Sequence, residues 1–199
     1  RQLIDAVSSD RAGRLENVHK FVDEIERQSR SMCLAEQLHR EGKLPKRVCH
    51  CDTKVNNMMF DEDGHVLCVI DLDTVMPSYV FSDFGDFLRT AANTVAEDEP
   101  DISKIAFRMD IFEAFTAGYL RSAGSFLTPV EKEHLPYAAM LFPYMQCVRF
   151  LTDYINGDTY YKTAYPTHNL VRARNQWQLF LSARSHADDM RRIIERGCK

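Results

Sequence analysis

Residues 50–57 read His50-Cys51-Asp52-Thr53-Lys54-Val55-Asn56-Asn57, and residues 70–73 read Ile70-Asp71-Leu72-Asp73. Between them lie a short apolar run at 57–60, the turn sequence Asp61-Glu62-Asp63-Gly64, and a second run at 65–70 that is rich in β-branched side chains. Two such runs around an Asp- and Gly-containing turn predict a β-hairpin, and we expect its second strand to be buried. Asp71 then lies at the end of that strand.

Three side chains in these stretches carry the oxygen atoms that Mg²⁺ prefers: Asp52, Asn57 and Asp71. In phosphoryl-transfer enzymes of the kinase type, a His-x-Asp turn presents a carboxylate to the attacking hydroxyl. An Asn five residues later and an Asp after a following strand hold the metal. We therefore predict that Asp52 is the catalytic base, that Asn57 and Asp71 are metal ligands, and that Lys54 neutralises the transferred phosphoryl group.

Further motifs extend this pattern, because Ser82-Asp83-Phe84-Gly85-Asp86 and Arg89-Thr90-Ala91-Ala92-Asn93-Thr94 follow the hairpin. Together these stretches resemble the aminoglycoside phosphotransferase and choline kinase superfamily, from about Leu44 to the C-terminus. Between residues 50 and 94 the sequence is most similar to the N-acetylhexosamine 1-kinases, which phosphorylate the anomeric hydroxyl of a sugar. The resemblance implies ATP as co-substrate, Mg²⁺ as cofactor and a sugar or other small alcohol as acceptor. Cys51 departs from the pattern, since that position is usually Gly or Asn.

Supporting roles are less sharply defined by the sequence. The resemblance implies that His50 is structural and hydrogen-bonds backbone near the metal-binding strand. Asp73 is either a second metal ligand or a loop cap. Asp83 and Asp86 can cap the helix that they open, where the helix dipole favours a carboxylate, and the resemblance implies that Asp86 braces the catalytic loop.

The fold class implied by the resemblance is α+β and mainly helical: one kinase-like C-terminal lobe over residues 1–199, with a small catalytic hairpin. Kinases of this type also need an N-terminal lobe with a phosphate-covering loop and a strand Lys. The 49 residues before His50 contain neither feature and have a helical pattern. We therefore expect that lobe to be absent from this chain, the isolated chain to be inactive, and the surface so exposed to be apolar and to favour self-association.

Helical patterns cover most of the chain outside the hairpin. Apolar residues at three- and four-residue spacing predict a long helix over 15–38 with a break near Ser29, and Thr128-Pro129-Val130-Glu131 combines an N-cap, a first-turn proline and a capping-box Glu. The other predicted segments are helices over 83–94, 102–121 and 128–154, an acidic loop over 97–101 that we expect to be solvated, a turn over 156–158, and a last helical region after Pro166.

Two residues in the later part of the chain are predicted to bind the acceptor. Arg149 and Tyr160 lie in a segment that resembles the sugar-contacting part of hexosamine kinases, and Asp52 meets the reacting hydroxyl. An alternative interpretation is purely structural: Arg149 pairs with Asp153 one helical turn later, and Tyr154, Tyr160 and Tyr161 pack within a loop.

Composition limits the other classes of function. The chain has 45% hydrophobic residues and a net charge of −4, which favours one globular core and gives no reason to expect nucleic acid as a partner. We expect a cytoplasmic protein with no membrane partner, because the sequence contains neither a long apolar span nor the apolar core of a signal peptide. Its six cysteines form neither a disulfide framework nor a zinc motif, and we predict reduced thiols that are mostly buried.

Three alternatives remain open at this stage. The first is another small-molecule kinase of the same superfamily, acting on choline, homoserine or an aminoglycoside. Asp71-Leu72-Asp73-Thr74-Val75 also matches the nucleophile motif of haloacid-dehalogenase-type phosphatases, although that fold requires alternating strands and helices downstream. The third is a non-catalytic pseudokinase module. We favour an ATP-dependent kinase that phosphorylates the anomeric hydroxyl of an N-acetylhexosamine.

Overall fold

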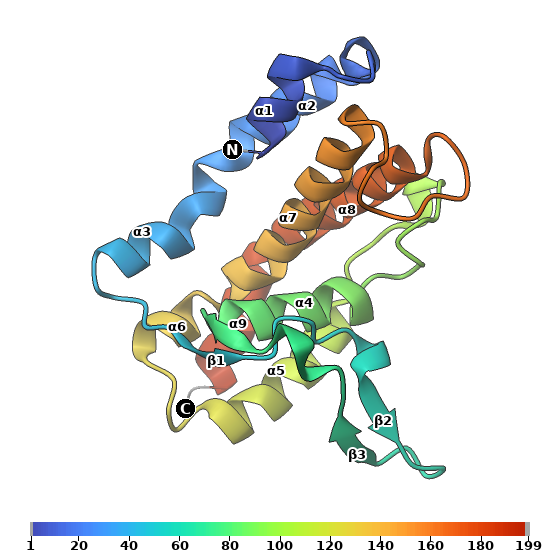
Figure 1. Cartoon of the computed structure of the whole chain (residues 1–199). Helices are drawn as coiled ribbons and strands as arrows, with labels where there is room; N and C mark the ends of the chain where they lie inside the picture. The colour runs from blue at the N-terminus through green and yellow to red at the C-terminus, as the bar shows by residue number, and fades with distance from the viewer. Residues whose placement is uncertain (1, 198–199) are drawn as a thin grey trace.

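The computed structural model describes residues 2–197 and is mainly helical, with two small antiparallel sheets (Figure 1). The α-helices are α1 Gln2–Ser9, α2 His19–Ser29, α3 Leu34–Arg40, α4 Phe81–Ala91, α5 Met109–Ala123, α6 Pro129–Glu133, α7 Leu135–Ile155, α8 His168–Ser185 and α9 Ala187–Gly197. The strands are β1 Arg47–Cys49, β2 Met58–Phe60, β3 Val66–Val69 and β4 Met76–Ser78. Short 3-10 turns include η3 Val55–Asn57, η4 Leu72–Thr74 and η5 Ile102–Lys104. The predicted α+β, mainly helical class is confirmed.

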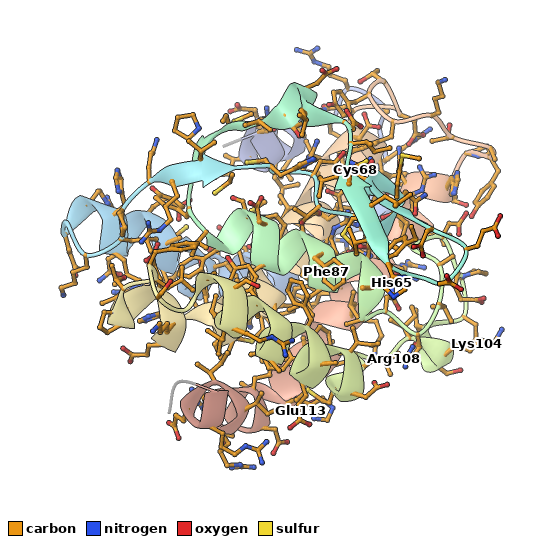
Figure 2. The ribbon with its side chains drawn as sticks, turned by 90° about the horizontal axis from the view of Figure 1, so that it is seen from below. His65, Cys68, Phe87, Lys104, Arg108 and Glu113 are labelled. Atoms are coloured by element: carbon orange, nitrogen blue, oxygen red, sulfur yellow. The ribbon has the colours of Figure 1, made fainter. Side chains whose placement is uncertain are left out.

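Helix α7 is the centre of the molecule, because it packs along α8 on one side and against α4 on another (Figure 1). Its buried residues recur through almost its whole length, which is the pattern of a helix covered on most faces. Aromatic side chains fill the neighbouring interface, where Phe87 of α4, labelled in Figure 2, stacks on Phe115 of α5 with ring centroids 4.1 Å apart. The core thus lies behind α4, the helix that follows the catalytic motifs.

Gly85 allows α4 to approach α7 closely. A β-carbon at this position would lie 2.5 Å from the backbone oxygen of Ala138 and would also clash with the ring of Phe142. Both atoms belong to α7, so only a residue without a side chain fits here. This close approach fixes the position of α4 relative to the rest of the helical body.

The predicted hairpin is present, since β2 pairs antiparallel with β3 and the register matches Met58 with Val69 and Met59 with Cys68. The expectation that its second strand is buried is wrong, because all four residues of β3 are exposed. In Figure 1 the hairpin projects from the helical body, and Cys68 and His65 mark it in the view of Figure 2. Its β-branched residues indicated a strand correctly but could not show what, if anything, covers it.

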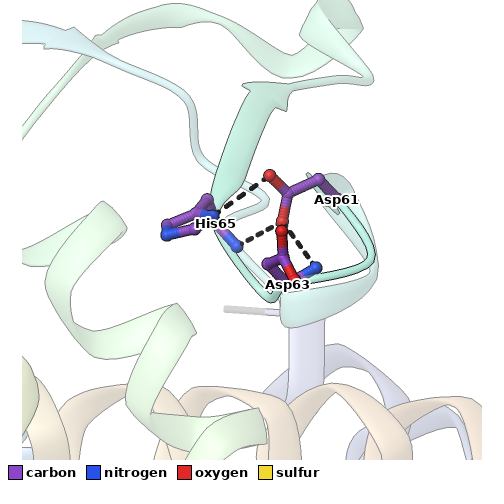
Figure 3. Close-up of side chains that lie close together, drawn as sticks. All are labelled: Asp61, Asp63 and His65. Atoms are coloured by element: carbon purple, nitrogen blue, oxygen red, sulfur yellow. Dashed lines mark hydrogen bonds and ion pairs between the residues drawn. The ribbon is translucent and has the colours of Figure 1, made fainter.

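The turn of the hairpin is closed by Asp61 (Figure 3). One carboxylate oxygen accepts hydrogen bonds from the backbone N–H of Asp63 at 3.0 Å and of His65 at 2.7 Å, and the other lies 3.1 Å from His65 Nδ1. Gly64 adopts φ +84°, a conformation that favours glycine. The Asp-rich sequence of this turn therefore has a local structural role.

A second sheet, not predicted from the sequence, joins β1 to β4 with Arg47 opposite Ser78 and Cys49 opposite Met76. Its two strands flank the entire segment that contains the catalytic motifs and the hairpin. The sheet therefore closes that segment into a loop whose two ends are held together next to α4.

Two predicted helices are interrupted. The segment predicted as a helix over 102–121 begins with η5 but is extended from Ile105 to Arg108, where backbone bonds join Arg108 to Ala92 and Thr94 to Ala106, and α5 starts only at Met109. The capping box at Thr128 is confirmed, yet the helix predicted to continue to 154 breaks at His134. Pro136 lacks the N–H that would continue α6, so α7 begins as a new helix.

The other predictions from local patterns fare better. The helix predicted over 15–38 does break after Ser29, and a turn does form at 156–158, where Gly157 has φ +91°. The predicted helix after Pro166 is two helices, α8 and α9, separated at His186.

The cysteines in the described part of the chain are free, but the prediction that most are buried is wrong. Cys49 and Cys147 are buried, Cys51 is half-buried, and Cys33 and Cys68 are exposed, while Cys198 lies outside the described residues. Within residues 2–197, no helix combines the length and apolar character needed to cross a membrane.

Candidate active site

Asp52 lies at the centre of a compact polar cluster in the loop between β1 and η3. Its Oδ2 accepts hydrogen bonds from Lys54 Nζ at 2.7 Å and from Asn57 Nδ2 at 2.9 Å, and Asn57 also bonds the backbone oxygen of Asp52. Burial raises the pKa of Asp52, but the hydrogen bonds from Lys54 and Asn57 outweigh it and hold the pKa below the ordinary aspartate range. The structure thus brings three of the predicted site residues together around an ionised carboxylate.

His50 connects this loop to the end of the hairpin. The backbone N–H of Asp52 donates to His50 Nδ1 at 3.3 Å, so Nε2 carries the proton and donates to the backbone oxygen of Ile70 at 3.0 Å. Ile70 directly precedes Asp71, and Thr74 in turn donates to the backbone oxygen of His50 at 2.6 Å. The predicted hydrogen bond of His50 to backbone near Asp71 is confirmed.

Asp71 follows β3 by two residues and has an unusual backbone conformation, with φ +62° and ψ +60°. Aspartate tolerates this left-handed region better than most residues, and such conformations concentrate at functional sites. The bend turns the chain from the strand into η4, which carries Asp73, and both carboxylates are exposed. Neither side chain is buried within the described residues, so both are accessible to a ligand.

Asp83 holds the candidate catalytic loop, residues 50–57, against α4. The sequence did not assign this role to Asp83. Its two carboxylate oxygens accept from the backbone N–H groups of His50 at 3.1 Å and Cys51 at 2.8 Å, and its backbone oxygen accepts from Thr53 Oγ1 at 2.7 Å. Cys51 has φ +66°, which gives a physical reason for the Gly or Asn usual at this position. An aspartate two residues after a buried helix start was the only available signal, and it fits a cap equally well.

Asp86, one helical turn after Asp83, is buried, bonds Arg89 and also contacts the loop through the backbone N–H of Thr53. Its Oδ1 accepts from Arg89 Nε at 3.1 Å, and Arg89 also pairs with Glu97 at 3.0 Å. Burial raises the pKa of Asp86, and the negative charge of Asp52 acts in the same direction. Glu97 belongs to the acidic run that was expected to be solvated, and its side chain is 41% exposed while it pairs with Arg89.

A cavity of about 610 Å³ opens beside the catalytic loop. It is lined by Asp52 and Lys54 from the loop, by Asp86 and Arg89 from α4, and by the later segment that carries Arg149 and Tyr160. Residues more than 90 positions apart therefore face one space, and five of the predicted site residues (Asp52, Lys54, Asp86, Arg149 and Tyr160) line it. Its size suits a small-molecule ligand.

Asp153 organises the far wall of this cavity. Its carboxylate accepts from the backbone N–H groups of Thr159, Tyr160 and Tyr161 at 2.9 to 3.0 Å, and from buried Asn169 at 2.9 Å. Because Asp153 is used in this way, the alternative pairing of Arg149 with Asp153 is wrong.

Arg149 instead lies against aromatic rings. Its guanidinium carbon is 6.0 Å from the ring centroid of Tyr160 and 5.6 Å from that of Tyr161. Tyr160 is 74% exposed, which is unusual for a large aromatic side chain that only packs within a loop. Arg149 and Tyr160 thus form an accessible cationic and aromatic surface.

The residues present fit a divalent metal site at the catalytic loop. Asn57 uses its amide nitrogen to bond Asp52, which leaves the amide oxygen as the group that can coordinate an ion. Asp71 offers an exposed carboxylate at the end of β3, next to the backbone that His50 holds. A different group, Asp61, Asp63 and His65, also has ligand atoms within 4.8 Å of one another, but it lies at the hairpin tip and its hydrogen bonds close the turn (Figure 3).

In a comparison with known protein families, residues 1–133 match the model of the phosphotransferase enzyme family, APH. The chain belongs to this phosphotransferase family. The matched region includes the catalytic loop, the hairpin, Asp71 and α4, and it ends before Arg149 and Tyr160. Membership supports a kinase-like phosphotransferase activity, and kinases of this family generally use ATP and Mg²⁺.

The phosphatase alternative is contradicted by the fold of this phosphotransferase. Both sheets in the described chain are two-stranded and antiparallel, and the segment after Asp71 is a 3-10 turn followed by one short strand and α4. A haloacid-dehalogenase-type site requires a parallel sheet built from alternating strands and helices.

Proposed function

We propose that this phosphotransferase is an ATP-dependent sugar kinase that transfers a phosphoryl group to the anomeric hydroxyl of an N-acetylhexosamine. The observation that carries the proposal is the cluster of Asp52, Lys54 and Asn57, because Asp52 and Lys54 line a cavity whose far wall contains Arg149 and Tyr160. An exposed aromatic face and hydrogen-bonding polar groups are the usual means of binding a sugar ring. The similarity of residues 50–94 to N-acetylhexosamine 1-kinases supports this branch of the family.

In the proposed mechanism Asp52 accepts the proton of the attacking hydroxyl. Its low pKa keeps it ionised at neutral pH, and its position is fixed by Asn57 and Lys54 on one side and by Asp83 through the backbone on the other. A weak base suffices, because positioning and electrostatic stabilisation supply most of the acceleration in phosphoryl transfer. Lys54 would stabilise the transferred phosphoryl group.

Asn57 and Asp71, with Asp73 as a further candidate, would hold Mg²⁺. When bound, the ion neutralises charge on the donor phosphates and on the group in transfer. The chain's own contribution is to keep these ligands in register with the base, which His50 does by bonding the residue before Asp71.

We further propose that the described helices are the C-terminal lobe of a kinase-like fold. The support is the exposed apolar surface of the hairpin, where Phe60, Val66, Leu67 and Val69 are between 43% and 61% exposed. A surface of this kind next to the catalytic loop suits an ATP-covering lobe packed onto it.

The charge of the cavity favours a sugar over the cationic acceptors of the superfamily. Among the described residues, its lining includes five basic side chains (Lys54, Arg89, Arg149, Lys162, Arg172) and three acidic ones (Asp52, Asp86, Glu97). A positively charged choline or aminoglycoside would meet net repulsion there, whereas a sugar would not.

The test is a screen of sugars and amino alcohols with ATP and Mg²⁺, using the longest native polypeptide that contains this chain. We expect N-acetylglucosamine or N-acetylgalactosamine, or a derivative of either, to be phosphorylated at the anomeric oxygen, detected by ³¹P NMR of the product and loss of the reducing end. Preferred turnover of choline, homoserine or an aminoglycoside would refute the sugar assignment and retain the kinase assignment. No turnover of any acceptor, with the metal ligands intact, would favour the pseudokinase alternative.

A further inference from the structure

The cavity beside Asp52 has two electrostatically different ends. At the catalytic end every lining carboxylate is paired within the described chain: Asp52 with Lys54 at 2.7 Å, and Asp86 and Glu97 with Arg89 at 3.1 and 3.0 Å. Those two cations are therefore already engaged by protein carboxylates. The remaining basic side chains of the lining, Arg149, Lys162 and Arg172, belong to the other end.

These three side chains form no ion pair with a carboxylate of residues 2–197. Arg149 contacts the amide of Gln146 at 3.4 Å and the rings of Tyr160 and Tyr161. Arg172 donates to the backbone oxygen of Lys162 at 3.1 Å and lies over the ring of Phe150. Three unpaired cations facing one cavity repel one another, so an arrangement of this kind is stabilised by an anionic ligand.

The three cations come from separate elements that the fold holds in place. Arg149 is on α7, Arg172 is on α8, and Lys162 is in the loop between them. The loop is fixed at its start by Asp153, through the backbone N–H groups of residues 159–161, and at Lys162 by the bond from Arg172. The backbone of this loop is therefore fixed by a buried carboxylate and a guanidinium. Lysines on an ordinary surface lack such support and are mobile.

We propose that Arg149, Lys162 and Arg172 form a subsite for an acidic substituent of the acceptor, so that the preferred substrate is an N-acetylhexosamine bearing a carboxylate, phosphate or sulfate. This inference rests on the proposed function and narrows its substrate class. The anomeric hydroxyl lies at Asp52, and the acidic group lies at the opposite end of the cavity. Arginine suits such a group because its planar guanidinium binds carboxylate and phosphate with two hydrogen bonds.

The test compares acceptors that share one ring and differ in charge, using the longest native polypeptide that contains this chain. The panel consists of N-acetylglucosamine, its 6-phosphate, its 6-sulfate and its 3-O-lactyl ether, which carries a carboxylate. We expect kcat/KM for at least one acidic sugar to exceed that for the neutral sugar by about tenfold, the effect of one charge-assisted hydrogen bond. The three acidic members distinguish the chemical source of the charge.

Lys162→Met is the informative variant, because Lys162 is exposed and its side chain forms none of the hydrogen bonds that build the loop. It should remove most of the preference for the acidic sugar, through KM, and Lys162→Arg should restore the preference. Arg174→Met is the matched control, since Arg174 is exposed on the same helix as Arg172 but does not line the cavity. It should leave all four values unchanged.

The outcomes separate this inference from the proposed function. Preference for the neutral sugar over all three acidic ones, or an acidic preference that Lys162→Met does not alter, overturns the subsite and leaves the sugar kinase intact. If no sugar is turned over, the proposed function fails, and calorimetric titration with the acidic sugars then decides the subsite. Binding that is lost in Lys162→Met supports it, and absence of binding overturns it.

Discussion

At the scale of single residues, Asp52 is defined by what surrounds it more than by its place in a motif. Two hydrogen-bond donors converge on one carboxylate oxygen, and the loop that carries it is bonded to Asp83 at consecutive backbone N–H groups. An aspartate in an ordinary turn uses its oxygens to close the turn itself, as Asp61 does. The difference between these two aspartates supports a chemical role for Asp52.

Asp52→Asn should lower kcat by about 10²- to 10⁴-fold, because it removes the acceptor of the hydroxyl proton. Folding should be unaffected, since the side chain is half-buried and packs in no apolar core. The measurement is steady-state turnover together with a thermal melt, and Glu62→Gln in the hairpin turn is the control. Near-normal turnover with an unchanged melt would exclude Asp52 as the base.

Lys54→Met should shift the pH dependence of whatever activity remains. The hydrogen bond from Lys54 is the largest influence that lowers the pKa of Asp52, so its removal raises that pKa. A base must be deprotonated to act, and activity is lost as the pH falls through its pKa. The acidic limb of kcat/KM should therefore move to higher pH in Lys54→Met and return in Lys54→Arg. An acidic limb at the same pH in all three proteins would show that Asp52 does not control it.

At the scale of elements, α4 determines where the catalytic loop lies. It carries Asp83, which bonds the loop, and Asp86 and Arg89, which line the cavity, and it is seated on α7 through Gly85. The same helix therefore faces the core on one side and the candidate site on the other. A change in its seating should affect stability and activity together.

Gly85→Ala should destabilise the protein by about 1–3 kcal/mol, because the added methyl group overlaps Ala138 and Phe142. Gly118→Ala is a matched control in the middle of α5, where the nearest atom to the new methyl group is Arg121 Nη2 at 3.8 Å. That variant should be stabilised by about 0.5–1 kcal/mol, the usual gain of alanine over glycine in a helix. Chemical denaturation of both variants tests the pair, and equal free energies of unfolding would contradict the close approach.

What the sequence predicted at this scale was local. The hairpin, the capping box at Thr128 and the break after Ser29 depend on neighbouring residues and were visible as patterns. The pairing of β1 with β4 and the hydrogen bonds of Asp83 join segments about 30 residues apart, so no local pattern contains them. Helix boundaries failed where tertiary bonds replaced helical ones, as between Ala92 and Arg108.

The residues of the candidate site likewise fall into those that the sequence predicts and those that it does not. Asp52, Asn57 and Asp71 were predictable because one loop and one hairpin carry them all. The far wall was predicted only through Arg149 and Tyr160, whereas Lys162, Arg172 and the organising role of Asp153 depend on how α7 and α8 pack. Side chains that come together only through the packing of distant helices have no recognisable spacing pattern in the sequence.

At the scale of the whole molecule, the proposed function makes the described residues one wall of an ATP site. The helical body supports the catalytic loop from behind, while the hairpin projects from it with its apolar side chains exposed (Figure 1). Asp71 and Asp73 stand at the base of this hairpin, also exposed. Within residues 2–197, the candidate metal ligands Asp71 and Asp73 are thus exposed.

We therefore expect residues 1–199 on their own to fold but to turn over no acceptor. The core around α7 is large enough to persist alone, since it includes many fully buried aromatic and aliphatic side chains. Catalysis of phosphoryl transfer depends on holding the γ-phosphate against the hydroxyl, and a single wall cannot restrict both partners. The exposed hairpin should also promote self-association, and Leu67→Lys should reduce it without lowering the melting temperature, because Leu67 is 61% exposed.

Three measurements test this expectation: calorimetric titration with Mg-ATP, a coupled turnover assay and sedimentation velocity. Each is performed on residues 1–199 and on the longest native polypeptide that contains them. The longer polypeptide should bind Mg-ATP tightly and turn over, whereas the 199-residue chain should bind it weakly and associate in a way that Leu67→Lys relieves. Micromolar binding of Mg-ATP by the 199-residue chain would mean that the nucleotide site is complete within it. The exposed apolar side chains of the hairpin would then need another explanation, and the assignment of this chain as one lobe of a kinase would be wrong.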